Sequence, residues 1–177
     1  MSNSMKFTSM VMVKALLILD ENGNRIIAKY YDNFLSNKNT QLDFEKRLFK
    51  KTKDSDDEIT MIDDCSCVFK SCVNLHFFII GLSSENELIL KKVLNTLFDG
   101  TNILLRNMLE YKVLIEKIEY VFILIDEMID DGIILDTDTE EICERIDKYK
   151  EDFMLGENSV RQALHSAKEQ IKWSILR

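Results

Sequence analysis

The pattern of apolar and polar positions in the first third of the chain predicts a β-hairpin. Residues 11–20 are almost all apolar, which is typical of a strand that is covered on both faces. Asn22-Gly23 supplies the positive φ angles of a tight turn, and residues 25–31 form the return strand.

The next elements follow from changes in the apolar period. Residues 40–51 carry apolar side chains at helical spacing and predict a helix. Three short runs rich in β-branched and aromatic residues predict strands over 59–62, 65–71 and 75–81.

The second half of the chain is predicted to be helical. Ser84 and Glu87 have the spacing of a capping box, so a helix is expected to begin there and to continue to Met108. The apolar stripe of residues 111–129 predicts a second long helix, closed by Gly132 in the left-handed conformation. Further helices are expected over TEEICERIDKY, after Gly132, and from about Ser159 to the C-terminus.

This order of elements predicts an α+β fold with one antiparallel sheet between helical layers. The chain has 177 residues, no proline and five glycines, and it contains no Pro- or Gly-rich linker. We expect a flexible N-terminus over 1–10, one domain over 11–150 and a helical tail over 151–177.

Composition narrows the classes of function. The net charge of −8 and the pI near 4.9 repel phosphate backbones and anionic lipid headgroups, which argues against direct binding to nucleic acid or membranes. The N-terminal apolar run is interrupted by Lys14 and does not have the form of a signal peptide, and no run reaches the length of a membrane span. Four cysteines without disulfide-framework spacing favour a reducing cytosolic location.

The segment IDEMIDDGIILDTDTEE, residues 125–141, holds eight carboxylates and no Lys or Arg. Alignment to a calcium loop places Ile129 and Leu135 at ligand positions, which argues against an EF-hand. A catalytic carboxylate pair would need an apolar pocket that no sequence pattern here indicates. The favoured interpretation is a glycine-capped helix end whose acids, opposed to the helix dipole, are either solvated or face a basic partner.

The remaining candidate chemistry is sparse. Cys65, Cys67, Cys72 and His76 lack the paired knuckle spacing of zinc sites, so buried core thiols are expected there, and Cys143 falls within a helix. His165 is expected on an exposed helical face. No phosphate-loop, dinucleotide or HExxH motif occurs, so we expect no enzyme activity, cofactor, metal or small-molecule substrate.

Several segments together resemble one family. VKALLILDENGNRIIAKYY, FEKRLFKKT, SENELILKKVLNTLFD, IDEMIDDGIILDTD and the terminal SAKEQIKWSILR are similar to the zeta-type small chains of coatomer, the COPI vesicle coat. The hairpin, the helix pair and the DEM-x-x-x-G segment also resemble the sigma-type small chains of clathrin adaptors. The resemblance covers nearly the whole chain from about Val13.

The resemblance implies a longin-like (SNARE-like) fold, with a five-stranded antiparallel sheet between one helix and a long helix pair. It implies a structural, non-enzymatic subunit of the coat that pairs with the gamma subunit within a heptameric complex. Such a coat is recruited to Golgi membranes by an Arf-family GTPase and carries retrograde Golgi-to-ER and intra-Golgi traffic, so the association of this chain with Golgi membranes and COPI vesicles would be indirect. Cargo binding is not transferred, because residues 107–112 do not reproduce the sigma-chain pattern.

The resemblance and the acidic stretch together suggest a partner interface. Its expected residues are Ala28, Lys29, Tyr30, Tyr31, Asp130, Asp131, Lys168, Gln170, Ile171, Trp173 and Leu176. Two alternatives stay open: a sigma-type adaptor chain or longin subunit of a tethering complex, and a calcium-regulated protein that uses residues 126–138.

Overall fold

The structure is a computed structural model that describes residues 11–55 and 58–149. Its centre is a five-stranded antiparallel sheet with the order β2-β1-β5-β4-β3. The strands are β1 (Val13–Asp20), β2 (Arg25–Tyr30), β3 (Ile59–Ile62), β4 (Cys65–Cys72) and β5 (Leu75–Leu82). The hairpin and the three later strands predicted from the sequence are therefore confirmed.

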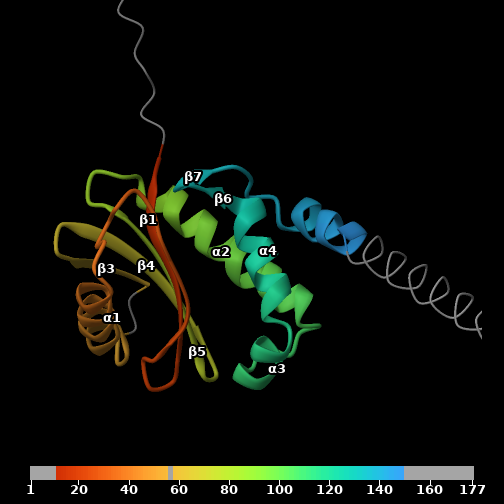
Figure 1. The fold of residues 1–177 in the computed structure, drawn as a ribbon, viewed down its shortest axis with the longest axis horizontal. Coiled ribbons are helices and arrows are strands. Elements are labelled where there is room, and N and C mark those ends of the chain that lie inside the picture. The colour runs from red at the N-terminus through yellow and green to blue at the C-terminus, as the bar shows by residue number, and fades with distance from the viewer. Residues whose placement is uncertain (1–10, 56–57, 150–177) are drawn as a thin grey trace, which may run out of the picture.

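Helices cover both faces of this sheet (Figure 1). Helix α1 (Lys38–Thr52) lies on one face, and α2 (Glu87–Leu104) and α4 (Ile118–Met128) lie on the other. A short helix, α3 (Tyr111–Glu116), joins α2 to α4, and a further helix covers residues 139–149. The predicted arrangement of one helix, a sheet and a helix pair is confirmed.

The apolar run of β1 explains its place at the centre of the molecule. Leu16 and Ile18 pack toward α2 and α4, whereas Leu17 and Leu19 pack toward α1 with Phe44. Because side chains alternate along a strand, a strand buried on both faces is apolar at nearly every position, and the buried Lys14 of β1 is paired with Asp32. Strand β1 therefore contributes side chains to both cores, as does its neighbour β5.

Gly100 in α2 has a packing role that the sequence did not indicate. A Cβ atom at this position would lie 2.9 Å from a terminal methyl of Leu124 in α4. The glycine therefore permits close approach of the two helices.

The predicted start of α2 is wrong in its capping residue. Asn86 is the N-cap, and its side-chain oxygen accepts from the Leu88 amide at 3.0 Å. Glu87 does not reach back to Ser84; instead it accepts from the Ser66 hydroxyl of β4 at 3.0 Å. The helix also ends at Leu104, short of Met108, because Arg106 and Asn107 adopt positive φ angles.

The predicted single helix over 111–129 is two helices. The chain leaves helical geometry at Lys117, which has φ −126° and ψ 25°, and α4 begins at the next residue. The buried residues Leu114 and Val121 stand seven positions apart, so the apolar stripe stays in phase across the break. The periodicity alone therefore could not detect it.

Gly132 is not a helix cap. Helix α4 ends at Met128, and the next residues form a small hairpin of β6 (Ile129–Asp130) and β7 (Ile133–Ile134). Asp131 and Gly132 form its turn with φ angles of 45° and 83°. The left-handed glycine was predicted, but the Asp-Gly pair between apolar residues is the signal of a tight hairpin turn and not of a helix end.

Helix 139–149 returns to the core after this hairpin. Asp138 caps it, since its carboxylate accepts from the Glu141 amide at 3.1 Å. Ile142, Cys143 and Ile146 are buried against the α2–α4 core. In the part of the chain that the structure describes, no helix is both long enough and apolar enough to cross a bilayer.

Candidate interaction sites at the two ends of strand β1

The β6–β7 hairpin is fixed to the beginning of β1. The Val13 amide donates to the Gly132 carbonyl at 2.8 Å, and Met12 bridges to Ile133. A Cβ atom at Gly132 would lie 2.6 Å from the Val13 carbonyl oxygen and 3.2 Å from Cβ of Tyr31. Only glycine fits this contact, so the acidic hairpin is held firmly against the sheet.

The predicted interface residues of β2 lie beside this hairpin. Ala28, Lys29 and Tyr30 are half-buried, and Tyr31 is buried in the α2–α4 core. Tyr30 donates its hydroxyl to Glu45 at 2.7 Å, and Lys29 forms an ion pair with Asp126. The structure thus brings Lys29 and Tyr31 close to the acidic stretch, whereas Ala28 and Tyr30 pack toward α1 on the other face of the sheet.

The Tyr31 hydroxyl is a buried polar group without a hydrogen-bond partner among the described residues. Burial raises the pKa of this phenol, and the nearby charges of Asp126 and Asp130 raise it further. The phenol therefore stays neutral, and its environment is acidic rather than basic.

Arg145 neutralises much of the acidic stretch from within the chain. Its guanidinium donates to Glu127 and to Asp136, each at 2.8 Å, and approaches Glu141 at 3.3 Å. Tyr149 also donates to Glu127, at 3.3 Å. The amide of Asp138 and the hydrogen bond from Arg145 hold the pKa of Asp136 below its ordinary value, so this carboxylate is ionised and bound.

These contacts explain why carboxylates are tolerated at the C-terminal end of α4. Asp126 and Glu127 face Lys29 and Arg145, so the unfavourable dipole interaction is offset by ion pairs. Asp130 and Asp131 are exposed, and no ion pair holds them within the described residues. Nowhere in residues 11–55 and 58–149 do three His, Cys, Asp or Glu side chains stand together as a metal site would require.

The cysteines lie in the two cores, as expected of structural thiols. Cys65 and Cys67 are buried on the α1 side and Cys143 on the α2–α4 side, whereas Cys72 is only half-buried against the α2–α4 core, and none of the four forms a disulfide. Burial raises the pKa of Cys67 to about 12, which keeps it protonated and unreactive. His76 lies against Phe49, and its Nδ1 is 2.7 Å from the Ser71 hydroxyl.

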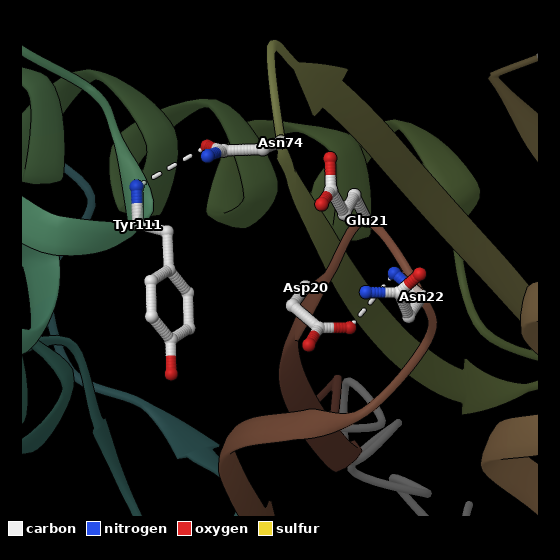
Figure 2. A pocket seen from close by; sticks show the side chains of 5 residues that line it. All are labelled: Asp20, Glu21, Asn22, Asn74 and Tyr111. Carbon is white, nitrogen blue, oxygen red and sulfur yellow. Dashed lines mark hydrogen bonds between the residues drawn. The ribbon is translucent and has the colours of Figure 1, made fainter.

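A pocket of about 300 Å³ lies at the other end of β1. It is lined by Asp20, Glu21 and Asn22 of the β1–β2 turn, by Asn74 of the β4–β5 turn and by Tyr111 of α3. Figure 2 shows the Tyr111 ring across from the Asp20 carboxylate, with Asn74 between the two segments. Sequence reasoning missed this pocket, because its three segments are far apart in the chain and none carries a motif.

Hydrogen bonds hold the parts of the pocket in place. The Asp20 carboxylate accepts from the Asn22 and Asn24 amides, each at 2.8 Å, and the Tyr111 amide donates to Asn74 Oδ1 at 3.1 Å. Burial opposes ionisation of Asp20, but the hydrogen bonds from Asn24 and Asn22 outweigh it and hold its pKa below the ordinary value. The turn thus presents a fixed negative charge.

The remaining sequence predictions fall on other residues. Lys168, Gln170, Ile171, Trp173 and Leu176 lie outside the described residues, as do His165, the last predicted helix and the predicted N-terminal extension. Their proposed roles stay predictions.

The fold defines a class, and the sequence comparison agrees with it. The family model of the clathrin adaptor complex small chain matches residues 12–152, so this chain belongs to that family. A chain in a "Homology model of the full-length AP-3 complex in a stretched open conformation" superposes with a TM-score of 0.63 at 14% identity, covering 84% of this chain and 99% of that one. This likeness supports the longin-like α+β fold.

Sequence relatives narrow the class to the coatomer branch. Coatomer subunit zeta-1 of Homo sapiens is 46% identical over 169 residues, or 96% of each chain. Coatomer subunit zeta-2 of Mus musculus is 40% identical over 96% of this chain and 82% of its own, and coatomer subunit zeta-3 of Arabidopsis thaliana is 36% identical over 93% of this chain and 94% of its own. The resemblance to zeta-type small chains, predicted from the sequence, is confirmed.

Proposed function

We propose that this chain is the zeta-type subunit of the COPI coat and acts there as a structural, non-enzymatic brace paired with the gamma subunit. The observation that carries the proposal is the 46% identity to coatomer zeta-1 across 96% of both chains. A match of that length leaves no room for an added catalytic domain within the aligned region.

The surface of the helix pair supports a role in assembly. Exposed apolar side chains occur in α2, in α4 and in the segment between them, namely Ile103, Phe122 and Met108. Large apolar side chains that remain exposed on one stretch are typical of surfaces that a partner covers. We propose that the gamma subunit covers part of this layer.

The same proposal gives the location of the chain. As a coat subunit it is cytoplasmic and peripheral on Golgi membranes and COPI vesicles, where it serves retrograde Golgi-to-ER and intra-Golgi transport. Recruitment by an Arf-family GTPase reaches this chain through other subunits, which agrees with its net charge of −8.

Co-expression tests the pairing. Full-length chain and the trunk of the gamma subunit are produced together, purified through a tag on one of them and passed over a gel-filtration column. We expect one peak that contains both proteins in equal amounts. Two separate peaks of independently stable proteins would contradict the pairing.

Charge reversal tests the proposed interface at the β6–β7 hairpin. Because Asp130 and Asp131 are exposed and unpaired within the described chain, Asp130→Lys with Asp131→Lys should weaken gamma binding about 10-fold, chiefly through slower association. The matched control is Asp43→Lys with Asp54→Lys, which changes the net charge equally on the α1 side. If the two double variants bind gamma with equal affinity, Asp130 and Asp131 are solvated surface residues outside the interface.

Truncation separates the coatomer assignment from its nearest alternative. Removal of residues 168–177 should abolish or weaken pairing with gamma-coatomer, while a sigma-type adaptor chain or a tethering-complex longin would keep its own large partner. The truncated chain is compared with the full chain in parallel pull-downs from the gamma subunit and from an adaptor trunk. Retained adaptor binding with no gamma binding by either form would favour the alternative.

A further inference from the structure

The pocket at the turn end of β1 is not explained by the pairing with gamma. Two of its walls are hairpin turns, and the third is the beginning of α3, the short helix that joins the two longer ones. Its volume of about 300 Å³ is enough for one long side chain, but it is small for most cofactors. The class of ligand that fits the pocket therefore depends on its five lining side chains.

Two carboxylates face this pocket without an internal cation. Arg25 is the basic residue nearest to them in the sequence, but its guanidinium is held on the α1 side of the sheet by Glu45 at 2.6 Å and Gln41 at 3.2 Å. Asp20 binds only amides of its own turn, and Glu21 is exposed with no ion pair among the described residues. The pocket therefore carries negative charge that no ion pair within the described residues neutralises.

The pocket also contains the aromatic ring of Tyr111, which favours a cationic ligand. Tyr111 is 43% exposed, and its ring forms the wall opposite the β1–β2 turn (Figure 2). A ring face beside carboxylates attracts an ammonium or guanidinium group by both charge and quadrupole. Because its backbone amide is tied to Asn74, Tyr111 is positioned before any ligand arrives.

Exposed apolar residues close in the chain to the lining residues favour a peptide as the carrier of the cation. Val73, next to Asn74, is 85% exposed and holds a φ of 48°, a conformation that a β-branched residue rarely adopts. Ile115 is one helical turn after Tyr111 and is 41% exposed. A free amine would use only the pocket, whereas a peptide with a basic and an apolar residue would use the rim as well.

We propose that this pocket binds the Lys or Arg side chain of an extended peptide segment from another protein. The cationic head lies between Glu21 and Asp20 and against the ring of Tyr111, and a neighbouring apolar residue of the peptide packs on Val73 and Ile115. The proposal does not depend on the pairing with gamma.

Labelled peptides test this site on the full-length chain. The probes share one neutral seven-residue frame of Gly, Ser and two Leu, and they differ only at the central residue, which is Arg, citrulline, Lys, norleucine or Glu. Fluorescence anisotropy gives each Kd. The Arg and Lys peptides should bind at least about 10-fold more tightly than their neutral counterparts, and the Glu peptide should be the weakest, because only a cation answers the two carboxylates.

Variants locate the binding on the structure. Glu21→Gln should weaken the Arg peptide about 3- to 10-fold, and Tyr111→Leu by a similar factor, while Tyr111→Phe keeps the ring and the affinity. The matched control is Glu140→Gln, an exposed acid far from the pocket that gives the same change in net charge. Glu21 lies in an exposed turn, so its variant folds even where Tyr111→Leu does not.

Three results would overturn the proposal. One is equal binding of the Arg and citrulline peptides. Another is the same loss for Glu21→Gln as for Glu140→Gln, which would mean general attraction to an acidic protein. The third is the absence of saturable binding of any probe to the full chain, alone or with the gamma trunk.

Discussion

The two ends of β1 treat acidic residues in opposite ways. At its beginning, the stretch 126–141 is rich in carboxylates, but Lys29 and Arg145 bind four of them within the chain. At its end, the turn has only Asp20 and Glu21, and Arg25 is bound elsewhere. The number of acidic residues in a segment therefore does not show which of them are available to a ligand. Their availability depends on where the folded chain places its Lys and Arg side chains.

The difference has a physical origin in how each end is built. The β6–β7 end gathers a hairpin, α4 and helix 139–149, so acids and bases from separate segments meet there. The pocket end is made of turns, in which carboxylates bind backbone amides instead of cations.

The largest expected effect concerns the residue that removes Arg25 from the pocket. Glu45 is 2% exposed and accepts from both Arg25 and Tyr30, so Glu45→Ala leaves a guanidinium and a phenol without their partner. We expect a loss of about 3 kcal/mol in the free energy of unfolding, measured by urea titration of the full-length chain. Tyr30→Phe, which deletes one hydrogen bond, should cost about 1 kcal/mol. A loss for Glu45→Ala no larger than for Tyr30→Phe would show that Glu45 does not hold Arg25 away from the turn.

The next effect tests the fixed hairpin at the other end. Gly132→Ala places a side chain at a φ of 83° and 2.6 Å from the backbone oxygen of Val13, so the hairpin must move away from β1. The expected loss is about 2 to 3 kcal/mol. Gly100→Ala is the matched control, because its added methyl meets the side chain of Leu124 rather than backbone, and the gain in helix propensity offsets part of that cost, so the net loss should be smaller, about 1 kcal/mol. Similar losses of unfolding free energy for both variants would mean that the contact between Gly132 and Val13 does not fix the hairpin to β1.

The smallest effect probes the neutralisation of the acidic stretch. Arg145→Met removes the ion pairs to Glu127 and Asp136 and should cost about 1 kcal/mol at pH 7, since the guanidinium is partly exposed. Lys91→Met, which removes the surface pair with Glu58, should cost less. Thermal unfolding followed by circular dichroism compares the two, and an Arg145→Met loss no greater than that of Lys91→Met would remove the contrast between the ends of β1.

The same variant should change the dependence of stability on pH. The folded-state pKa of Asp136 lies below its ordinary value of 3.8, so the stability it contributes is present above that value and is lost as the pH falls through the lowered pKa. Arg145→Met removes the part of the pKa shift that comes from the guanidinium, but the hydrogen bond from the Asp138 amide remains. The acid limb of the stability curve should therefore be shallower in the variant than in the unchanged chain.

Sequence reasoning found the sheet because its signals are local. The all-apolar β1, the Asn-Gly turn and the short β-branched runs each specify one element without reference to another. It failed where two local signals competed. Asp131-Gly132 was interpreted as a helix end because a strong apolar stripe preceded it, although Asp-Gly between Ile residues also predicts a hairpin.

The candidate sites were predictable only in part, because they depend on contacts between distant segments. The acidic stretch was visible as composition, but its pairing with Arg145 requires helix 139–149 to fold back onto α4. The pocket joins residues 20–22, 74 and 111, and no periodicity relates these positions. Similarity to relatives identifies the family, whereas sites of this kind can be found only from the three-dimensional structure.

The bond between Val13 and Gly132 also orders events during synthesis. The amide of Val13 emerges roughly 120 residues before the carbonyl that accepts from it. At about 5 to 20 residues per second, the first strand waits on the order of 6 to 24 seconds for this contact. Strands β1 to β5 can pair meanwhile, so the nascent sheet is complete while the beginning of β1 is still open, and β6–β7 covers it last.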